Sequence, residues 1–208
     1  MISDLNMQNL QLRRIVLSGN IREDTASYFL EQITALEVTD MGKPISIYID
    51  TYGGSVDAAL CMYDAIKACS CPIVTIGIGK VMSAGVLLLA AGDKGNRFIT
   101  ENTRVMVHEV SGGAFGSISE METSVQETRR LQETYVDLLV LSTGVKKAKL
   151  LKDMKEETYM SAEEAVNYGL VDRMVPTRKT TRRVSAKKDP EPATKKTTTK
   201  KRTKKQEV

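Results

Sequence analysis

The chain alternates short runs of hydrophobic, often β-branched residues with longer stretches in which apolar residues recur at helical spacing. Residues 13–19, 44–50 and 72–78 form runs of the first kind and are predicted to be strands. Residues 24–37 and 56–68 lie between them and are predicted to be helices. This alternation favours an α/β fold with a mostly parallel core, whose functional loops lie at the carboxyl ends of the strands.

The pattern continues, less regularly, in the second half of the chain. A strand is predicted over residues 104–109, ending near His108, and residues 111–116 are too rich in glycine for a helix. The remaining predicted elements are a short helix over 146–154, a helix that begins with a capping box at 161 and ends at 169, and a closing strand over 170–175. Residues 1–11 carry no convincing pattern.

The longest predicted helix begins at Ser117, which has the capping-box spacing to Glu120, and it extends to about Leu141 and closes at Gly144. Its apolar positions do not form one narrow stripe; they include Met121, Val125, Leu131, Tyr135, Leu138 and Leu139. This distribution indicates packing against more than one surface, including another subunit.

Ser83 stands at the junction between the predicted strand that precedes it and a run of apolar helix formers that ends at Gly92. The first N–H groups of a helix lack intrahelical partners and its dipole favours negative charge, so an alkoxide or a substrate oxyanion would be stabilised there. Ser83 is therefore a candidate nucleophile. The alternative is that Ser83 is an ordinary N-cap.

Charge divides the chain into two parts. Residues 177–208 hold 13 Lys and Arg against 3 Asp and Glu, whereas the net charge of the whole chain is only +4. We expect one globular domain over residues 1–176 and a disordered basic tail over 177–208, which lacks large apolar residues. The tail either attracts polyanions such as nucleic acid without sequence readout or serves only as a solubilising extension.

The composition argues against a metal centre and against membrane insertion. The three cysteines, Cys61, Cys69 and Cys71, have no partner cluster elsewhere, and the chain has one histidine, so neither a metal site nor a cofactor is expected. The longest apolar run, residues 86–91, is too short for a membrane span, and the first residues do not resemble a signal peptide. We expect a cytoplasmic protein with reduced thiols.

A serine nucleophile needs a base to take its proton, and His108 is the only histidine that can serve. No spacing rule links His108 to Ser83, so a purely structural histidine is the alternative. A triad also needs a carboxylate, which composition does not identify because the chain has 26 Asp and Glu.

Five motifs, in order, resemble the proteolytic subunit of the Clp protease (the ClpP family) and its phage-encoded relatives. They are the segments at 49–56, at 82–92, at 105–108, at 112–116 and at 159–172. The resemblance extends from about Arg14 to Val175. It favours Ser83 and His108 as a catalytic pair over the two structural alternatives.

The resemblance implies a crotonase-like fold of stacked βαβ units. Ser83 would be the nucleophile and His108 the general base, and backbone N–H groups of Gly54 and Ala84 would form the oxyanion hole. Gly53, Gly112 and Gly113 would contact the substrate, with the Gly112–Gly113 segment pairing with an extended peptide as an added strand. The long helix from Ser117 would be the handle that interleaves two stacked rings of subunits.

Three departures from the family pattern qualify these expectations. Glu157 stands where the family has the triad Asp; a Glu can orient a histidine, although its extra methylene changes the geometry. Glu156 stands where many members carry an Arg used between rings. Only about a dozen residues precede the first predicted strand, which leaves docking of an ATP-driven (AAA+) unfoldase open.

Two hypotheses from different classes follow, with a third more remote. The first is a self-compartmentalised serine endopeptidase that hydrolyses polypeptides, such as a phage or prophage version that acts on capsid or scaffold proteins. The second is a weakly active or non-proteolytic assembly protein of the same fold. The third, an enzyme acting on acyl-thioesters, would not need Ser83 and His108 together.

Overall fold

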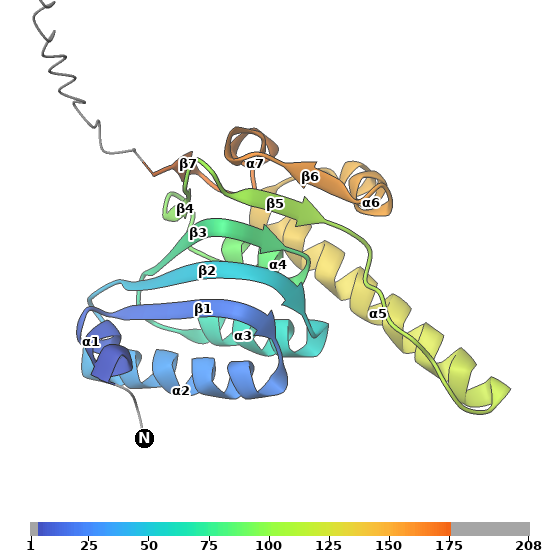
Figure 1. The fold of residues 1–208 in the computed structure, drawn as a ribbon, viewed down its shortest axis with the longest axis horizontal. Helices are drawn as coiled ribbons and strands as arrows, with labels where there is room; N and C mark the ends of the chain where they lie inside the picture. The colour runs from blue at the N-terminus through green and yellow to red at the C-terminus, as the bar shows by residue number, and fades with distance from the viewer. Residues whose placement is uncertain (1–3, 176–208) are drawn as a thin grey trace, which may run out of the picture. The chain divides into compact units, whose positions relative to one another are not determined.

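The computed structural model describes residues 4–175, and within that range strands and helices alternate along the chain (Figure 1). The strands are β1 (Arg14–Ile21), β2 (Ile45–Gly54), β3 (Ile73–Met82), β4 (Arg97–Ile99), β5 (Arg104–Val107), β6 (Thr158–Met160) and β7 (Arg173–Met174). The helices are α1 (Asp4–Gln11), α2 (Glu23–Thr39), α3 (Val56–Ala68), α4 (Ala84–Ala90), α5 (Ile118–Thr143), α6 (Lys147–Lys155) and α7 (Ala162–Tyr168). The predicted α/β class is confirmed.

The strands form one sheet that divides at β3. Its main path runs β1-β2-β3-β4-β7 with parallel pairing throughout. The first half of β3 pairs with β4 and its last residues, Lys80 to Met82, pair with β5, which in turn pairs antiparallel with β6. The carboxyl ends of β2, β3 and β5 consequently lie at one side of the molecule, toward the right in Figure 1.

Helices α2 and α3 lie along one face of the sheet, and α4 packs behind β2 and β3 (Figure 1). All seven residues of α4 are buried, which explains why its sequence is uniformly apolar rather than amphipathic. Gly85 lies so close to Thr51 of β2 that a Cβ there would overlap the threonine methyl group. The helix that follows Ser83 is therefore locked against the sheet by close packing.

Helix α5 differs from the others because its first half leaves the body of the molecule (Figure 1). Both predicted capping boxes are confirmed: Ser117 accepts the Glu120 N–H at the start of α5, and Ser161 accepts the Glu164 N–H at the start of α7. Gly144 closes α5 in the left-handed conformation that glycine adopts without strain.

Several elements differ from the sequence-based expectation. Residues 4–11 form α1, although no pattern predicted it, and the closing strand is shorter than the predicted 170–175. Strands β4 and β6 were not predicted because each has only three residues and is defined by its pairing with a distant strand. The predicted tail, 177–208, lies outside the described residues.

A buried ion pair joins β4 to the segment before β7. Arg97 is 5% exposed; its Nη2 donates to Asp172 Oδ1 at 2.6 Å, and its Nη1 donates to the Ser142 carbonyl at 2.9 Å. Burial would raise the pKa of Asp172, but hydrogen bonds from the Arg97 side chain and backbone, together with its charge, outweigh it and lower that pKa. The pair fixes the edge of the main sheet to the end of α5.

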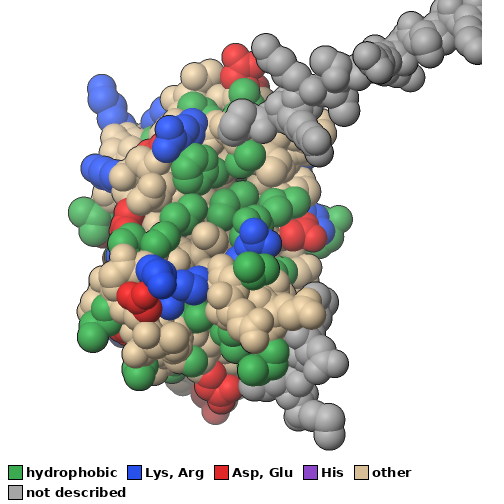
Figure 2. Space-filling view, turned by 90° about the vertical axis from the view of Figure 1, so that its left-hand side faces the viewer, with side chains coloured by type: hydrophobic (Ala, Val, Ile, Leu, Met, Phe, Trp, Pro, Cys, Tyr) green, Lys and Arg blue, Asp and Glu red, His purple; other side chains and the backbone are tan. Residues whose placement is uncertain are grey.

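The surface carries apolar side chains away from the carboxyl ends of the strands. Figure 2 views the side on which the strands begin, and hydrophobic side chains gather there between Lys and Arg side chains.

Among residues 4–175, no helix combines the length and the apolar character that a membrane crossing requires.

Candidate active site

Ser83 occupies the turn between β3 and α4 with φ +54° and ψ −129°. This backbone conformation is unfavourable for a residue with a Cβ and costs about 1–3 kcal/mol, so it persists only where the surroundings enforce it. The Ser83 side chain makes no capping hydrogen bond to α4. Ser83 thus occupies the N-cap position of α4 without capping the helix through its side chain, and its hydroxyl is free for another partner.

That partner is His108, whose Nε2 lies 2.7 Å from Ser83 Oγ. The sheet register brings the two together: Met82 pairs with Met106, and the Ser83 N–H donates to the Met106 carbonyl at 2.9 Å. Ser83 and His108 therefore follow directly from the adjacent ends of two parallel strands. They are 25 positions apart along the chain, which is why no local spacing could predict the contact.

Glu157 reaches the other side of the imidazole. The antiparallel register of β5 and β6 pairs Val107 with Thr158, so its continuation places His108 opposite Glu157. The His108 Nδ1 lies 3.8 Å from Glu157 Oε1, which is an ion-pair distance but too long for a hydrogen bond. The Glu157 side chain is 65% exposed and its backbone has φ +49°, so solvent competes for its carboxylate.

Gly53 lies against the serine turn, and Gly54 lies against Ile21 of β1. A Cβ on Gly53 would come within 2.6 Å of Ser83 Cβ, and one on Gly54 would overlap the Ile21 carbonyl. Both glycines also have positive φ, +102° and +149°. Only glycine allows β2 to pass this close to Ser83, as the paired glycines suggested.

The two backbone N–H groups that the resemblance assigns to the oxyanion hole belong to Ala84 and Gly54. Ala84 is the first residue of α4, so its N–H has no acceptor within that helix. Ser55 donates its N–H to the Ile21 carbonyl across β1 and β2, and because successive N–H groups of a strand alternate in direction, the Gly54 N–H points away from β1. Both groups belong to segments that flank Ser83.

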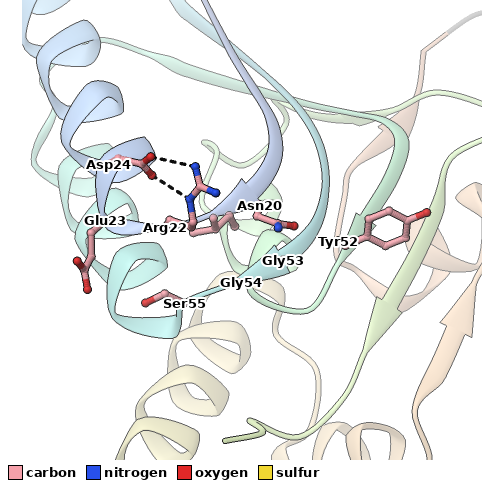
Figure 3. A pocket seen from close by; sticks show the side chains of 9 residues that line it. Asn20, Arg22, Glu23, Asp24, Tyr52, Gly53, Gly54 and Ser55 are labelled. Carbon is pink, nitrogen blue, oxygen red and sulfur yellow. Dashed lines mark hydrogen bonds and ion pairs between the residues drawn. The ribbon is translucent and has the colours of Figure 1, made fainter.

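A cavity of about 760 Å³ opens beside these glycines (Figure 3). Its lining comes from the ends of β1 and β2 and the starts of α2 and α3, including Arg22, which Figure 3 shows paired with Asp24. Gly53, which lies against Ser83, lines this cavity, whereas Ser83, His108 and Glu157 are not among its lining residues.

Gly112 and Gly113 lie in the segment that joins β5 to α5. Both are exposed, and among residues 4–175 no hydrogen bond joins them to Ser83, His108 or Glu157. The start of this segment is held by Gln132 of α5, whose Oε1 accepts the Val110 N–H at 2.7 Å. Backbone of an exposed, glycine-rich segment is accessible to an extended ligand.

Tyr135 is a site residue that sequence reasoning missed. Its hydroxyl donates to the Ser83 carbonyl at 2.8 Å from the inner half of α5. The sequence presented Tyr135 as one apolar position of a long helix, and the available signal was chemical: a buried tyrosine normally finds a partner for its hydroxyl. Which partner depends on tertiary structure.

No three His, Cys, Asp or Glu side chains in the described part of the chain gather as metal ligands would. The described contacts join the Ser83 hydroxyl to the His108 imidazole and place the Glu157 carboxylate 3.8 Å from its other nitrogen. A comparison with protein-family models matches residues 2–178 to the family described as Clp protease. The match includes every strand and helix of the structure and all the motifs from 49 to 172.

Proposed function

The chain belongs to the Clp protease family, and we propose that it is a serine endopeptidase with Ser83 as the nucleophile and His108 as the general base. The observation that carries this proposal is the 2.7 Å contact between His108 Nε2 and the hydroxyl of Ser83, which has a strained backbone and a side chain that does not cap α4. Hydrogen-bond contact between a nucleophile and its base is the geometry that proton transfer requires. The test is labelling of Ser83 by a fluorophosphonate, which reacts with activated serines.

The proposed reaction has the two stages of a serine hydrolase. His108 takes the proton from Ser83 as Oγ attacks the scissile carbonyl, and the N–H groups of Gly54 and Ala84 stabilise the oxyanion. The imidazolium then gives that proton to the leaving amine, which leaves an acyl-enzyme. Water, deprotonated by His108, releases the acyl group and restores the serine.

Glu157 is proposed to orient His108 and to stabilise its charged form. The support is its position opposite His108 in the continued β5–β6 register and the 3.8 Å separation from Nδ1. Its exposure makes this contribution smaller than that of a buried carboxylate, because water screens the charge. Loss of the Glu157 carboxylate would then lower the rate of catalysis without abolishing it.

Replacing Glu157 by Gln is expected to lower kcat by about 10- to 100-fold, less than the about 10⁴-fold loss seen for a buried triad carboxylate. Glu157→Asp should retain a substantial part of the activity. Glu156→Gln is the matched control because Glu156 is the adjacent exposed glutamate, and it should keep the parent kcat. If Glu156→Gln is impaired and Glu157→Gln is not, the roles of the two glutamates are exchanged.

The substrate is proposed to be an extended polypeptide. It would pair with the backbone at Gly112 and Gly113 on one side of Ser83 and pass Gly53 toward the 760 Å³ cavity on the other side. Pairing through main-chain hydrogen bonds gives affinity with little sequence preference. Cleavage would therefore be broadly specific.

A homo-oligomer, as the resemblance implied, is proposed to assemble through α5. The exposed first half of α5 carries apolar side chains at Ile118, Met121 and Val125, which share one face, and Phe115 just before it is 94% exposed. A protruding helix with an unpartnered apolar face is typical of an interface. Stacked rings, and contact with an AAA+ unfoldase, are proposed on the resemblance alone.

The expected result in sedimentation velocity at micromolar concentration is a species several times larger than the 23.0 kDa chain. Val125→Glu places a charge on the apolar face of α5 and should shift the distribution toward smaller species. Thr123→Glu places the same charge on the opposite, exposed face and should leave assembly unchanged. A parent protein that sediments only as a monomer would contradict the proposal.

The alternative function is a weakly active or non-proteolytic assembly protein, which the 3.8 Å gap to the exposed Glu157 favours over a fully efficient triad. Phage capsid or scaffold proteins as substrates, and nucleic acid as a partner of the basic tail, are further proposals that rest on the resemblance and on charge. Absence of fluorophosphonate labelling in the assembled protein would favour the alternative.

A further inference from the structure

We propose that Tyr135 is a positioning residue of the active site, whose hydroxyl fixes the orientation of the peptide unit between Ser83 and Ala84. The inference rests on the proposed function, because it concerns the N–H group of Ala84 as an oxyanion donor. It assigns to helix α5 a direct part in shaping the site.

The contact is short, buried and directional. Tyr135 is 2% exposed, and its hydroxyl donates to the Ser83 carbonyl at 2.8 Å. Burial raises the pKa of the Tyr135 phenol above its usual value, so the group remains a protonated donor at every pH at which the protein is folded and active. The hydrogen bond is thus present at every pH at which activity can be measured.

Peptide geometry transmits this contact to the other side of the serine. The unit that contains the Ser83 carbonyl also contains the Ala84 N–H, and in a planar trans peptide the two groups point in opposite directions. No cis peptide bond occurs in the described chain. Holding the carbonyl toward Tyr135 therefore aims the Ala84 N–H away from it. A donor on the carbonyl also polarises the unit and strengthens its N–H as a donor.

A second N–H group also donates to the Ser83 carbonyl, so an effect of Tyr135 on catalysis can be told apart from an effect on stability. The Val86 N–H donates to the same oxygen at 2.9 Å, so removal of the Tyr135 hydroxyl does not leave that carbonyl unsatisfied. What is lost is a lateral restraint on a turn held at φ +54°. The expected consequence is a misaligned oxyanion donor in a protein that still folds.

The test compares Tyr135→Phe with Tyr63→Phe in the full-length protein. Tyr63 is also buried, and its hydroxyl contacts the Ser142 hydroxyl at 3.3 Å, so its replacement removes a comparable group that does not touch the serine turn. For Tyr135→Phe, kcat on a small fluorogenic peptide should fall about tenfold or more while KM stays within about twofold, because the oxyanion exists only in the transition state. The rate of fluorophosphonate labelling should fall with kcat. Tyr63→Phe should keep the parent values of all three.

Folding and assembly are measured for both variants by thermal unfolding and sedimentation. If Tyr135→Phe does not fold, Tyr135→Met, which fills similar space without a donor, takes its place with the same expectation. Four outcomes would each overturn the positioning role. They are a parent-like kcat in the folded variant, an effect on KM alone, an equal loss of kcat in Tyr63→Phe, and failure of both Tyr135 variants to fold. Ser83→Ala is assayed in parallel: an active Ser83→Ala protein refutes the proposed function itself, whereas an inactive one with parent-like Tyr135→Phe refutes only this inference.

Discussion

Replacing Ser83 by alanine is expected to abolish peptidase activity, with a fall in kcat of about 10⁴-fold or more. His108→Ala should cause a loss of similar size, and the double variant should lose little more, because members of a triad act as a unit. The physical reason lies in the proposed mechanism: Ser83 Oγ, 2.7 Å from His108 Nε2, gives its proton to His108 as it attacks, so loss of either group removes the same step.

The measurement is hydrolysis of a fluorogenic peptide, with fluorophosphonate labelling followed by mass spectrometry to locate the modified residue. Ser18→Ala provides the control, since Ser18 is an exposed serine of β1 whose loss should change neither readout. Labelling that persists in Ser83→Ala, or hydrolysis at the parent rate, would show that another residue is the nucleophile. Sedimentation of each variant excludes loss of assembly as the cause.

Replacing Asp172 by alanine is expected to give the largest loss of stability, about 3 kcal/mol in the free energy of unfolding. Arg97 would then keep its charge in a site where it is 5% exposed, with the Ser142 carbonyl but no carboxylate beside it. A loss of this size lowers the melting temperature by roughly 6–12 °C in a domain of this length. Urea unfolding checks the free energy directly.

Asp137→Ala is the matched control, because Asp137 forms an ion pair with Lys147 in which both side chains are about half exposed or more. Surface pairs contribute about 0–1 kcal/mol, so this variant should remain close to the parent. Equal stabilities of the Asp172 and Asp137 variants would contradict the role given to the buried pair.

The pH dependence of the same pair has a definite sign. The pKa of Asp172 is lowered in the folded protein, so the stabilisation is present above its ordinary pKa of 3.8 and is lost as pH falls through the folded value. The stability difference between the parent and Asp172→Ala should therefore shrink below about pH 4. A constant difference down to pH 2 would indicate that packing, not charge, explains the effect.

Local sequence determined most of the elements and several of their ends. Hydrophobic runs predicted β1, β2 and β3, and helical periodicity predicted α2 and α3, because these elements bury side chains in a pattern that the chain itself records. Capping boxes at Ser117 and Ser161 fixed the starts of α5 and α7, since capping satisfies backbone groups within four residues. The short strands β4 and β6 are defined by pairing with strands distant in sequence, so no local pattern predicted them.

For the candidate active site, the sequence by itself indicated the family through its ordered motifs and predicted Ser83 and His108 as a pair, because a helix-start serine and a single histidine leave few alternatives. Tertiary structure decided the geometry. It turned the Ser83 side chain toward His108 instead of into a capping hydrogen bond, and it brought the Tyr135 hydroxyl to the Ser83 carbonyl. It also placed Glu157 Oε1 3.8 Å from His108 Nδ1, beyond hydrogen-bond distance. These outcomes depend on strand register and helix packing between residues 25 to 52 positions apart, which no local pattern encodes.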